Sequence, residues 1–347
     1  MNAMELLIDK SNLIMPMLSA DKTAAMQQMA ARLTGENYDT HILAISETFA
    51  AEAAAHINAA QRPVIVAGYT AVLALAGGAL SRLAEDIRIP VIYTDKAKGV
   101  IPCDHRYAVC TLGASEECQQ LIDSADFILA LDTQEQLWEL RASCPILYLA
   151  SVDEPQTCTL SDALCRIRSL CREKSVPNSA MHTGEELFRR EMAFGRDLSF
   201  PMCPEKVLFD IRYALALDDI LVTDAGAAES WVMGYYDCYQ PDTCLFTRSA
   251  GTAVMGAVSA KLAKPDHHVL AITDETGLSR SDFEYMQQLH APVVVLALHA
   301  PEQKLCADVA DLGVAVTSIR SAAQLIPALQ FALRSGHPCV IDCPAQI

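Results

Sequence analysis

The sequence has little positive charge and few features of a membrane or secreted protein. It carries 26 Lys and Arg against 43 Asp and Glu, a formal net charge of −17. Such an acidic chain repels phosphate backbones and anionic lipids, so we expect no nucleic-acid or membrane partner. No apolar run reaches the roughly eighteen residues of a membrane span, and no secretory signal opens the chain. A cytoplasmic location is expected.

The cysteines lack the spacing of a metal or redox motif. Among 13 cysteines no pair is spaced C-x-x-C, and the nearest approach is Cys339 to Cys343 on a predicted strand. A chain of 347 residues is also too long for a disulfide scaffold. We interpret the cysteines as buried thiols in a reducing compartment.

Several motifs of common enzyme classes are missing too. The sequence has no P-loop and no H-E-x-x-H, and "GLSRS" at 277–281 lacks the second glycine of a nucleophile elbow. The stretch 67–78 lacks the G-x-G-x-x-G spacing of a dinucleotide site. These patterns therefore nominate no catalytic residue.

What is present is a repeated alternation of buried strands and helices. With 52% hydrophobic residues, the chain is globular and long enough for two domains. The alternation predicts α/β architecture: two tandem doubly wound domains with mainly parallel sheets, the first Rossmann-like. Strands are expected at 41–46, 62–71, 89–94, 125–132, 144–151, 219–226, 268–274, 291–298, 314–319 and 338–344.

A polar stretch rich in prolines interrupts this alternation and sets the domain boundaries. We expect an N-terminal helical extension at 1–44, with a helix after Ser19–Asp21, and a central domain at 45–172. A linker at 173–203 and a second α/β domain at 204–347 follow. A last helix is expected before the final strand, with Ser321 as its N-cap and Gly336 as its stop.

The order of motifs resembles the thiamine-diphosphate-dependent enzymes. In the second domain the resemblance rests on "ILVTDAG", "SAGTAVMGAVSAK", "VLAITDETG" and "APVVVLALHA"; in the first it rests on "RPVIVAGYTAV", "TDKAKGVIP" and "ADFILALDT". The acetolactate synthase, pyruvate oxidase and benzoylformate decarboxylase branch is the most similar. The resemblance implies a central domain followed by a pyrophosphate-binding domain with the thiamine-diphosphate-binding fold.

The same resemblance implies a site for thiamine diphosphate and Mg²⁺. In the family a Gly-Asp-Gly-Ser turn gives its Asp to magnesium, and an Asn closing the next strand gives the second side-chain ligand. Here Glu275 falls at the metal-binding Asp and Gly277 closes the turn. Asp224 and Gly226 keep a D-x-G turn, and Gly251 and Thr252 open the loop before the next helix. These four and Gly277 are the expected cofactor-binding residues, and Glu275 the expected metal ligand.

Several positions depart from the family pattern. Asp274 and Thr276 replace glycines where the backbone should approach the diphosphate, and they add bulk and one negative charge. His299 stands where the second ligand is expected, and imidazole is a poor ligand for magnesium. Ala253 replaces a large residue that shapes the cofactor in the family. We therefore expect a degenerate cofactor site whose binding of thiamine diphosphate is doubtful.

Three functions remain open on these grounds. The favoured one is a homologue that is non-catalytic alone, with a binding, regulatory or structural role. We also expect the family's pyrimidine-binding domain to be absent, because the residues before 45 are too few to form it. The first alternative is one subunit of a split enzyme, an acetolactate synthase-like carboligase or 2-oxo acid decarboxylase, completed by a separate chain with that domain.

The second alternative is nucleotide or acyl-CoA binding by the central domain. Some relatives bind FAD or ADP there, and Gly68 and Gly113 occupy the matching turns. Family members pair their catalytic domains across subunits, so a homo-oligomer is expected in each case.

Overall fold

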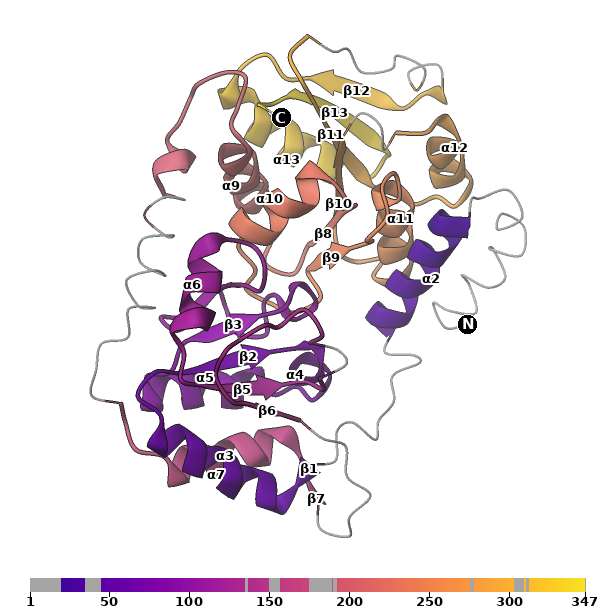
Figure 1. Ribbon diagram of the computed structural model, residues 1–347. Helices are drawn as coiled ribbons and strands as arrows, with labels where there is room; N and C mark the ends of the chain where they lie inside the picture. The colour runs from indigo at the N-terminus through magenta and orange to yellow at the C-terminus, as the bar shows by residue number, and fades with distance from the viewer. Residues whose placement is uncertain are drawn as a thin grey trace. The chain divides into compact units, whose positions relative to one another are not determined.

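A computed structural model describes most of the chain (Figure 1). The residues described are 20–34, 45–134, 137–149, 157–174, 189, 192–274, 278–302, 309 and 312–346. They fall into two compact units. The central unit comprises Tyr38–Arg190 with Cys238–Pro241, and the C-terminal unit comprises Met1–Asn37, Glu191–Asp237 and Asp242–Ile347.

The central unit is built on a parallel sheet of five strands in the order β4-β3-β2-β5-β6. The strands are β2 (Pro63–Ala67), β3 (Val91–Tyr93), β4 (Ala108–Thr111), β5 (Phe127–Leu131) and β6 (Ile146–Tyr148). Apart from the edge strand β6, they are buried throughout, as short continuous apolar runs predict. A short antiparallel pair joins β1 (Ile45–Ser46) to β7 (Thr157–Cys158).

Helices cover both faces of this sheet. Alternate strand residues face two separate apolar clusters, as the two-residue period of a strand requires. The larger cluster holds α3 (Glu47–Ala59), α4 (Tyr69–Leu73), α5 (Gly77–Ile87) and α7 (Leu160–Leu170). The smaller one holds α6 (Glu116–Ser124).

The C-terminal unit has a parallel sheet of six strands in the order β12-β13-β11-β10-β8-β9. The strands are β8 (Ile220–Thr223), β9 (Cys244–Phe246), β10 (Val269–Asp274), β11 (Val294–His299), β12 (Ala315–Ser318) and β13 (Cys339–Pro344). The helices are α2 (Ala20–Thr34), α9 (Pro204–Ala214), α10 (Ala227–Tyr235), α11 (Ala253–Ala263), α12 (Arg280–Gln288) and α13 (Leu325–Ser335). Residues of α2, α11 and α12 share one apolar cluster with the sheet, while α9 and α13 pack on each other.

The predicted fold class is confirmed: both main sheets are parallel, flanked by helices, and neither is closed into a barrel. Three short strands, β4, β7 and β9, were not expected from the sequence, because each has only two to four residues. The predicted strand at 41–46 is described only at Ile45–Ser46. Its remaining residues lie outside the described part of the chain.

The expected end of the last helix is confirmed, and its expected start is wrong. Gly336 ends α13 in the left-handed conformation, with φ of +69°. Ser321 begins instead a short 3₁₀ turn, Ala322–Gln324, and α13 follows from Leu325. The 3₁₀ turn accounts for the difference, since such turns commonly lead into α-helices.

One loop belongs to the central unit although the chain around it belongs to the other. The Cys103 N–H donates to the Cys238 carbonyl at 3.0 Å. Gly99, at φ of +87°, lies so close to this loop that a Cβ there would approach the Gln240 oxygen to 2.2 Å. Among the described residues, no helix has the length and apolar character needed to cross a membrane.

Candidate functional site

The C-terminal sheet has one topological switch point, between β8 and β10. From β8 the chain moves outward to β9, and it then returns to place β10 on the other side of β8. Ligands of open α/β sheets bind in the crevice at the carboxyl ends of such strands. Here those ends are Thr223–Asp224 and Thr273–Asp274.

Asp224 is buried in this crevice, and its carboxylate accepts hydrogen bonds from other groups of the protein. Its Oδ2 accepts hydrogen bonds from the Gly251 N–H at 2.8 Å and the Thr273 hydroxyl at 3.0 Å. The Ala253 N–H also donates to the carboxylate. Asp224 therefore caps the start of α11, the place where an anionic ligand would otherwise find backbone donors.

The pKa of Asp224 reports the balance of these contacts. Burial raises the pKa above its usual range, the hydrogen bonds lower it less, and the nearby charge of Asp274 raises it further. A second carboxylate beside a buried one makes the crevice unfavourable for another anion.

The other predicted cofactor-binding residues lie around Asp224. Gly226 and Gly251 have φ of +138° and +71°, conformations that side chains rarely adopt, so both turns require glycine. Thr252 is buried, and its hydroxyl donates to the Ser249 carbonyl at 2.5 Å and lies 2.6 Å from the hydroxyl of Thr247. The structure thus brings four of the five predicted residues together.

The turn that carries the remaining predictions is not described. Glu275, Thr276 and Gly277 lie outside the described residues, so the metal-ligand prediction for Glu275 stays a prediction. Asp274, at the end of β10, is half-buried.

His299, at the position of the expected second metal ligand, is buried and engaged on both sides of its ring. Its Nδ1 lies 2.7 Å from the Ala300 carbonyl oxygen, and its Nε2 lies 2.6 Å from Oδ1 of Asp342. The latter two atoms are close without the alignment of a hydrogen bond, so the contact is an ion pair when the ring is protonated. Asp342 comes from β13, the strand paired with β11.

Among the described residues, His299 does not suit a magnesium ion. Magnesium needs hard oxygen ligands that it can share with phosphate, and the ring nitrogens of His299 already face protein oxygens. Within the described ranges, no group of three or more His, Cys, Asp or Glu side chains could hold a metal ion.

The central unit has a corresponding switch point between β2 and β5. There Asp132, buried at the end of β5, accepts the Thr70 hydroxyl at 2.7 Å through Oδ1 and the Thr70 N–H at 3.3 Å through Oδ2. Gly68 is required by this carboxylate, since a Cβ there would lie 2.1 Å from Asp132 Oδ2. Asp132 thus occupies the turn that a nucleotide phosphate would use. Gly113, at φ of +77°, is an open turn glycine.

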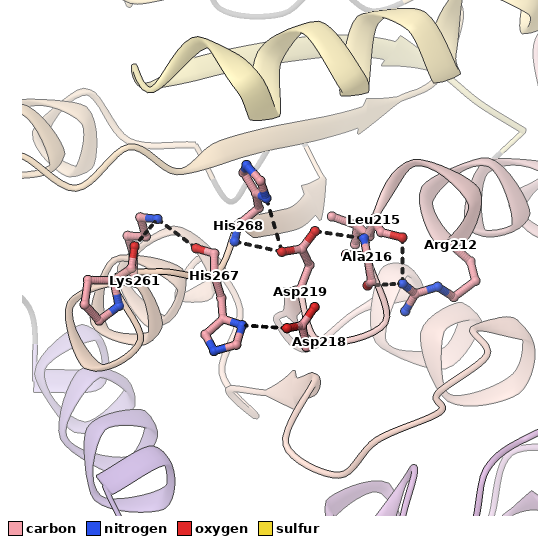
Figure 2. Close-up of polar contacts among 9 residues, drawn as sticks. Arg212, Leu215, Ala216, Asp218, Asp219, Lys261, His267 and His268 are labelled. Atoms are coloured by element: carbon pink, nitrogen blue, oxygen red, sulfur yellow. Dashed lines mark hydrogen bonds and ion pairs between the residues drawn. The ribbon is translucent and has the colours of Figure 1, made fainter.

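A further polar cluster lies at the opposite, amino edge of the C-terminal sheet (Figure 2). Asp219 accepts the Ala216 and His268 N–H groups, each at 2.8 Å, and lies 3.2 Å from the His268 ring. His267 pairs with Asp218 at 3.6 Å. Both histidines therefore have acidic partners that join two loops, which is a structural role.

Sequence reasoning missed Asp342 and Asp132. Asp132 directly follows the apolar strand β5, and this position was a usable signal, because carboxyl ends of parallel strands line the crevice; Asp342 lies within β13. Which strands are neighbours was not readable from the sequence, so neither contact could be foreseen.

Comparison with known proteins shows which proteins the chain resembles. Residues 50–136 match the model of the thiamine pyrophosphate enzyme central domain. An acetolactate synthase large subunit of Mycobacterium tuberculosis is 28% identical over 339 residues, covering 84% of this chain and 60% of that protein. A probable acetolactate synthase large subunit of Methanocaldococcus jannaschii is 24% identical over 275 residues, covering 70% and 46%. A putative thiamine pyrophosphate-containing protein of Bacillus subtilis is 21% identical over 332 residues, covering 83% and 58%.

The chain spans less than two thirds of the length of these relatives. The family resemblance found in the sequence is confirmed by the match to the central domain and by relatives that extend across both units. The chain is similar to thiamine-pyrophosphate-dependent enzymes in its central unit and to acetolactate synthase large subunits across both units.

Proposed function

We propose that this chain is a non-catalytic member of its family, with a binding, regulatory or structural role in an oligomer. The observation that carries the proposal is the environment of His299. A residue at the second metal-ligand position with Nδ1 facing Ala300 and Nε2 facing Asp342 offers no donor to magnesium.

The crevice between β8 and β10 supports the same proposal. Asp224 takes up the backbone donors at the start of α11, and Asp274 adds a second carboxylate nearby. A diphosphate entering this crevice would lose donors to one acid and be repelled by both. In this proposal the site keeps the family's turns at Gly226 and Gly251 but not its ligand.

A thermal-stability measurement tests the proposal. Thiamine diphosphate with Mg²⁺ should leave the melting temperature of the native chain unchanged at millimolar cofactor, because a ligand stabilises only a protein that binds it. A variant with the family's residues, Asp274→Gly, Glu275→Asp, Thr276→Gly and His299→Asn, is the matched control. We expect it to gain cofactor-dependent stabilisation, and equal stabilisation of both proteins would contradict the proposal.

The alternative is a catalytic subunit of an acetolactate synthase-like carboligase or 2-oxo acid decarboxylase. Its support is the similarity to acetolactate synthase large subunits across both units, with the loops at Gly226 and Gly251 retained. A separate chain would supply the pyrimidine-binding domain. Consumption of pyruvate by the chain with its co-purified partners, dependent on thiamine diphosphate, would favour this alternative.

Nucleotide binding by the central unit has less support. Asp132 holds the donors beside Gly68, so an FAD or ADP phosphate would have to displace it. Relatives of this chain are named large subunits, a name that implies a partner for those proteins. For this chain we propose a homo-oligomer in the cytoplasm, which light scattering after size-exclusion chromatography would test.

A further inference from the structure

Helix α2 precedes the central unit in sequence but packs in the C-terminal unit. Its buried apolar residues follow helical spacing and form one face: Ala25, Met26, Met29, Ala30 and Leu33. In Figure 1 this helix lies against α11. The N-terminal segment therefore contributes directly to the unit that carries the candidate site.

The face of α11 that packs against α2 is apolar and is buried by that helix. Every residue of α11 from Ala253 to Ala260 is buried, although a helix packed only on a sheet exposes one side. The hydroxyl of Ser259, itself fully buried, donates to the Met26 carbonyl at 2.7 Å. Without α2 an apolar helix face would be open to solvent.

An ion pair joins α2 to the next helix, α12. The Lys22 ammonium lies 2.5 and 2.6 Å from the two carboxylate oxygens of Asp282. Asp282 stands in the first turn of α12, and its side chain has 0% exposure. Burial raises the pKa of Asp282, and Lys22 opposes that effect. Removing the cationic partner of a buried carboxylate is strongly destabilising.

The ion pair between Lys22 and Asp282 matters because of where α12 begins. The helix begins at Arg280, shortly after residues 275–277, which match the metal- and diphosphate-binding motif of the family in sequence. We propose that α2 is a strap, and that Lys22 is a positioning residue that fixes the start of α12 through Asp282. The link to a ligand rests on the proposed function, whereas the strap itself does not.

The occupant of this surface is the chain's own α2. A basic residue near each end of α2 pairs with an acid of the C-terminal unit. Lys22 pairs with Asp282, and the Nε of Arg32 lies 2.7 Å from Oδ1 of Asp242. A second copy could supply the same helix, and the experiment below distinguishes the two sources.

Hydrogen exchange measured by mass spectrometry on the full chain tests the strap without any ligand. In Lys22→Met we expect amides of α12 to exchange about tenfold faster or more, because the buried Asp282 loses the Lys22 ammonium. The matched control is Arg32→Met, which breaks the other ion pair of α2 and should leave α12 exchange near the native rate. Equal effects of the two substitutions on α12, or none from Lys22→Met, would overturn the proposal.

Exchanging the two charges of the Lys22–Asp282 pair provides a second test, in which protection of α12 should be restored. Lys22→Glu alone should accelerate α12 exchange, and Lys22→Glu with Asp282→Lys should restore most of the protection. A double variant that folds and shows no restoration counts against the pair. If it does not fold, the comparison of Lys22→Met with Arg32→Met decides.

The source of the strap is tested on the native protein. Chains that carry photo-methionine and are labelled with ¹⁴N or ¹⁵N are unfolded together, refolded and irradiated, which links Met26 and Met29 of α2 to the neighbouring residues of α11. Linked peptides of a single isotope support a strap from the same chain. Hybrid ¹⁴N–¹⁵N pairs would overturn it and assign the strap to a second copy.

Discussion

Substituting Gly68 by Ala tests whether Asp132 fills the crevice of the central unit. Gly68 has φ of −99° and ψ of −174°, which any residue can adopt, so the cost of the added methyl group comes from contact alone. That methyl group would lie 2.1 Å from Asp132 Oδ2 and 2.4 Å from Asp132 Cβ. The carboxylate must therefore move.

The magnitude follows from what Asp132 then loses. Its oxygens accept the Thr70 hydroxyl at 2.7 Å and the Thr133 N–H at 2.9 Å. Losing buried hydrogen bonds to a charged group costs about 1.5–3 kcal/mol. Overpacking of a close-packed site adds about 1–3 kcal/mol. We expect Gly68→Ala to lower the free energy of unfolding of the central unit by about 2.5–6 kcal/mol.

Native-state hydrogen exchange in urea, read at the amides of β2 and β5, measures this free energy for the central unit alone. Gly78→Ala is the matched control, because its methyl group would lie 4.0 Å from the nearest heavy atom. Ala is the better helix former, so this control should stabilise the unit by about 0.5–1 kcal/mol. A loss below about 1 kcal/mol for Gly68→Ala would refute the crowded contact with Asp132.

Two further predictions use the ionisation of buried groups. The pKa of Asp224 is raised from 3.8, mainly by burial, so the folded state binds a proton more tightly than the unfolded one. Asp224 therefore stabilises the folded state at acidic pH, and this contribution is lost as the pH rises above the ordinary carboxyl range. In Asp224→Asn the free energy of unfolding should fall less over this pH range. Parallel curves of unfolding free energy against pH for the two proteins would contradict the prediction. Burial raises the pKa of Cys343 to about 12 and of Cys171 to about 11, whereas Cys165 is exposed. Iodoacetamide at pH 8 should label Cys165 faster than Cys171 and Cys343 in the native protein, as peptide mass spectrometry would report, and labelling of Cys343 as fast as Cys165 would show that its thiol is not buried.

The fold was predictable because buried strands of parallel sheets are continuous apolar runs. β2, β5, β8 and β11 were all found near their predicted positions. The three strands that were missed are short and have polar residues close on both sides, whereas β3 and β6, equally short, lie within longer apolar runs. β9, for example, has three residues between polar loops.

The candidate site was predictable only in part. The D-x-G turn and Gly251, which line one side of the crevice, were predictable, because turns at positive φ favour glycine and this preference is visible in the sequence. The partners of His299 and Gly68 come from strands distant in the chain, and neither Asp342 nor Asp132 belongs to a recognisable motif. The packing of α2 on α11 was equally hidden, because an amphipathic helix does not reveal which surface it covers.

Isothermal titration of thiamine diphosphate into the native chain, with and without Mg²⁺, tests the central claim most directly. We predict no heat of binding in either titration, because His299 and Asp224 are engaged within the protein. Magnesium-dependent binding at micromolar strength would contradict the account. It would mean that the turn at 275–277 holds the metal despite its neighbours, and that the chain is a catalytic subunit.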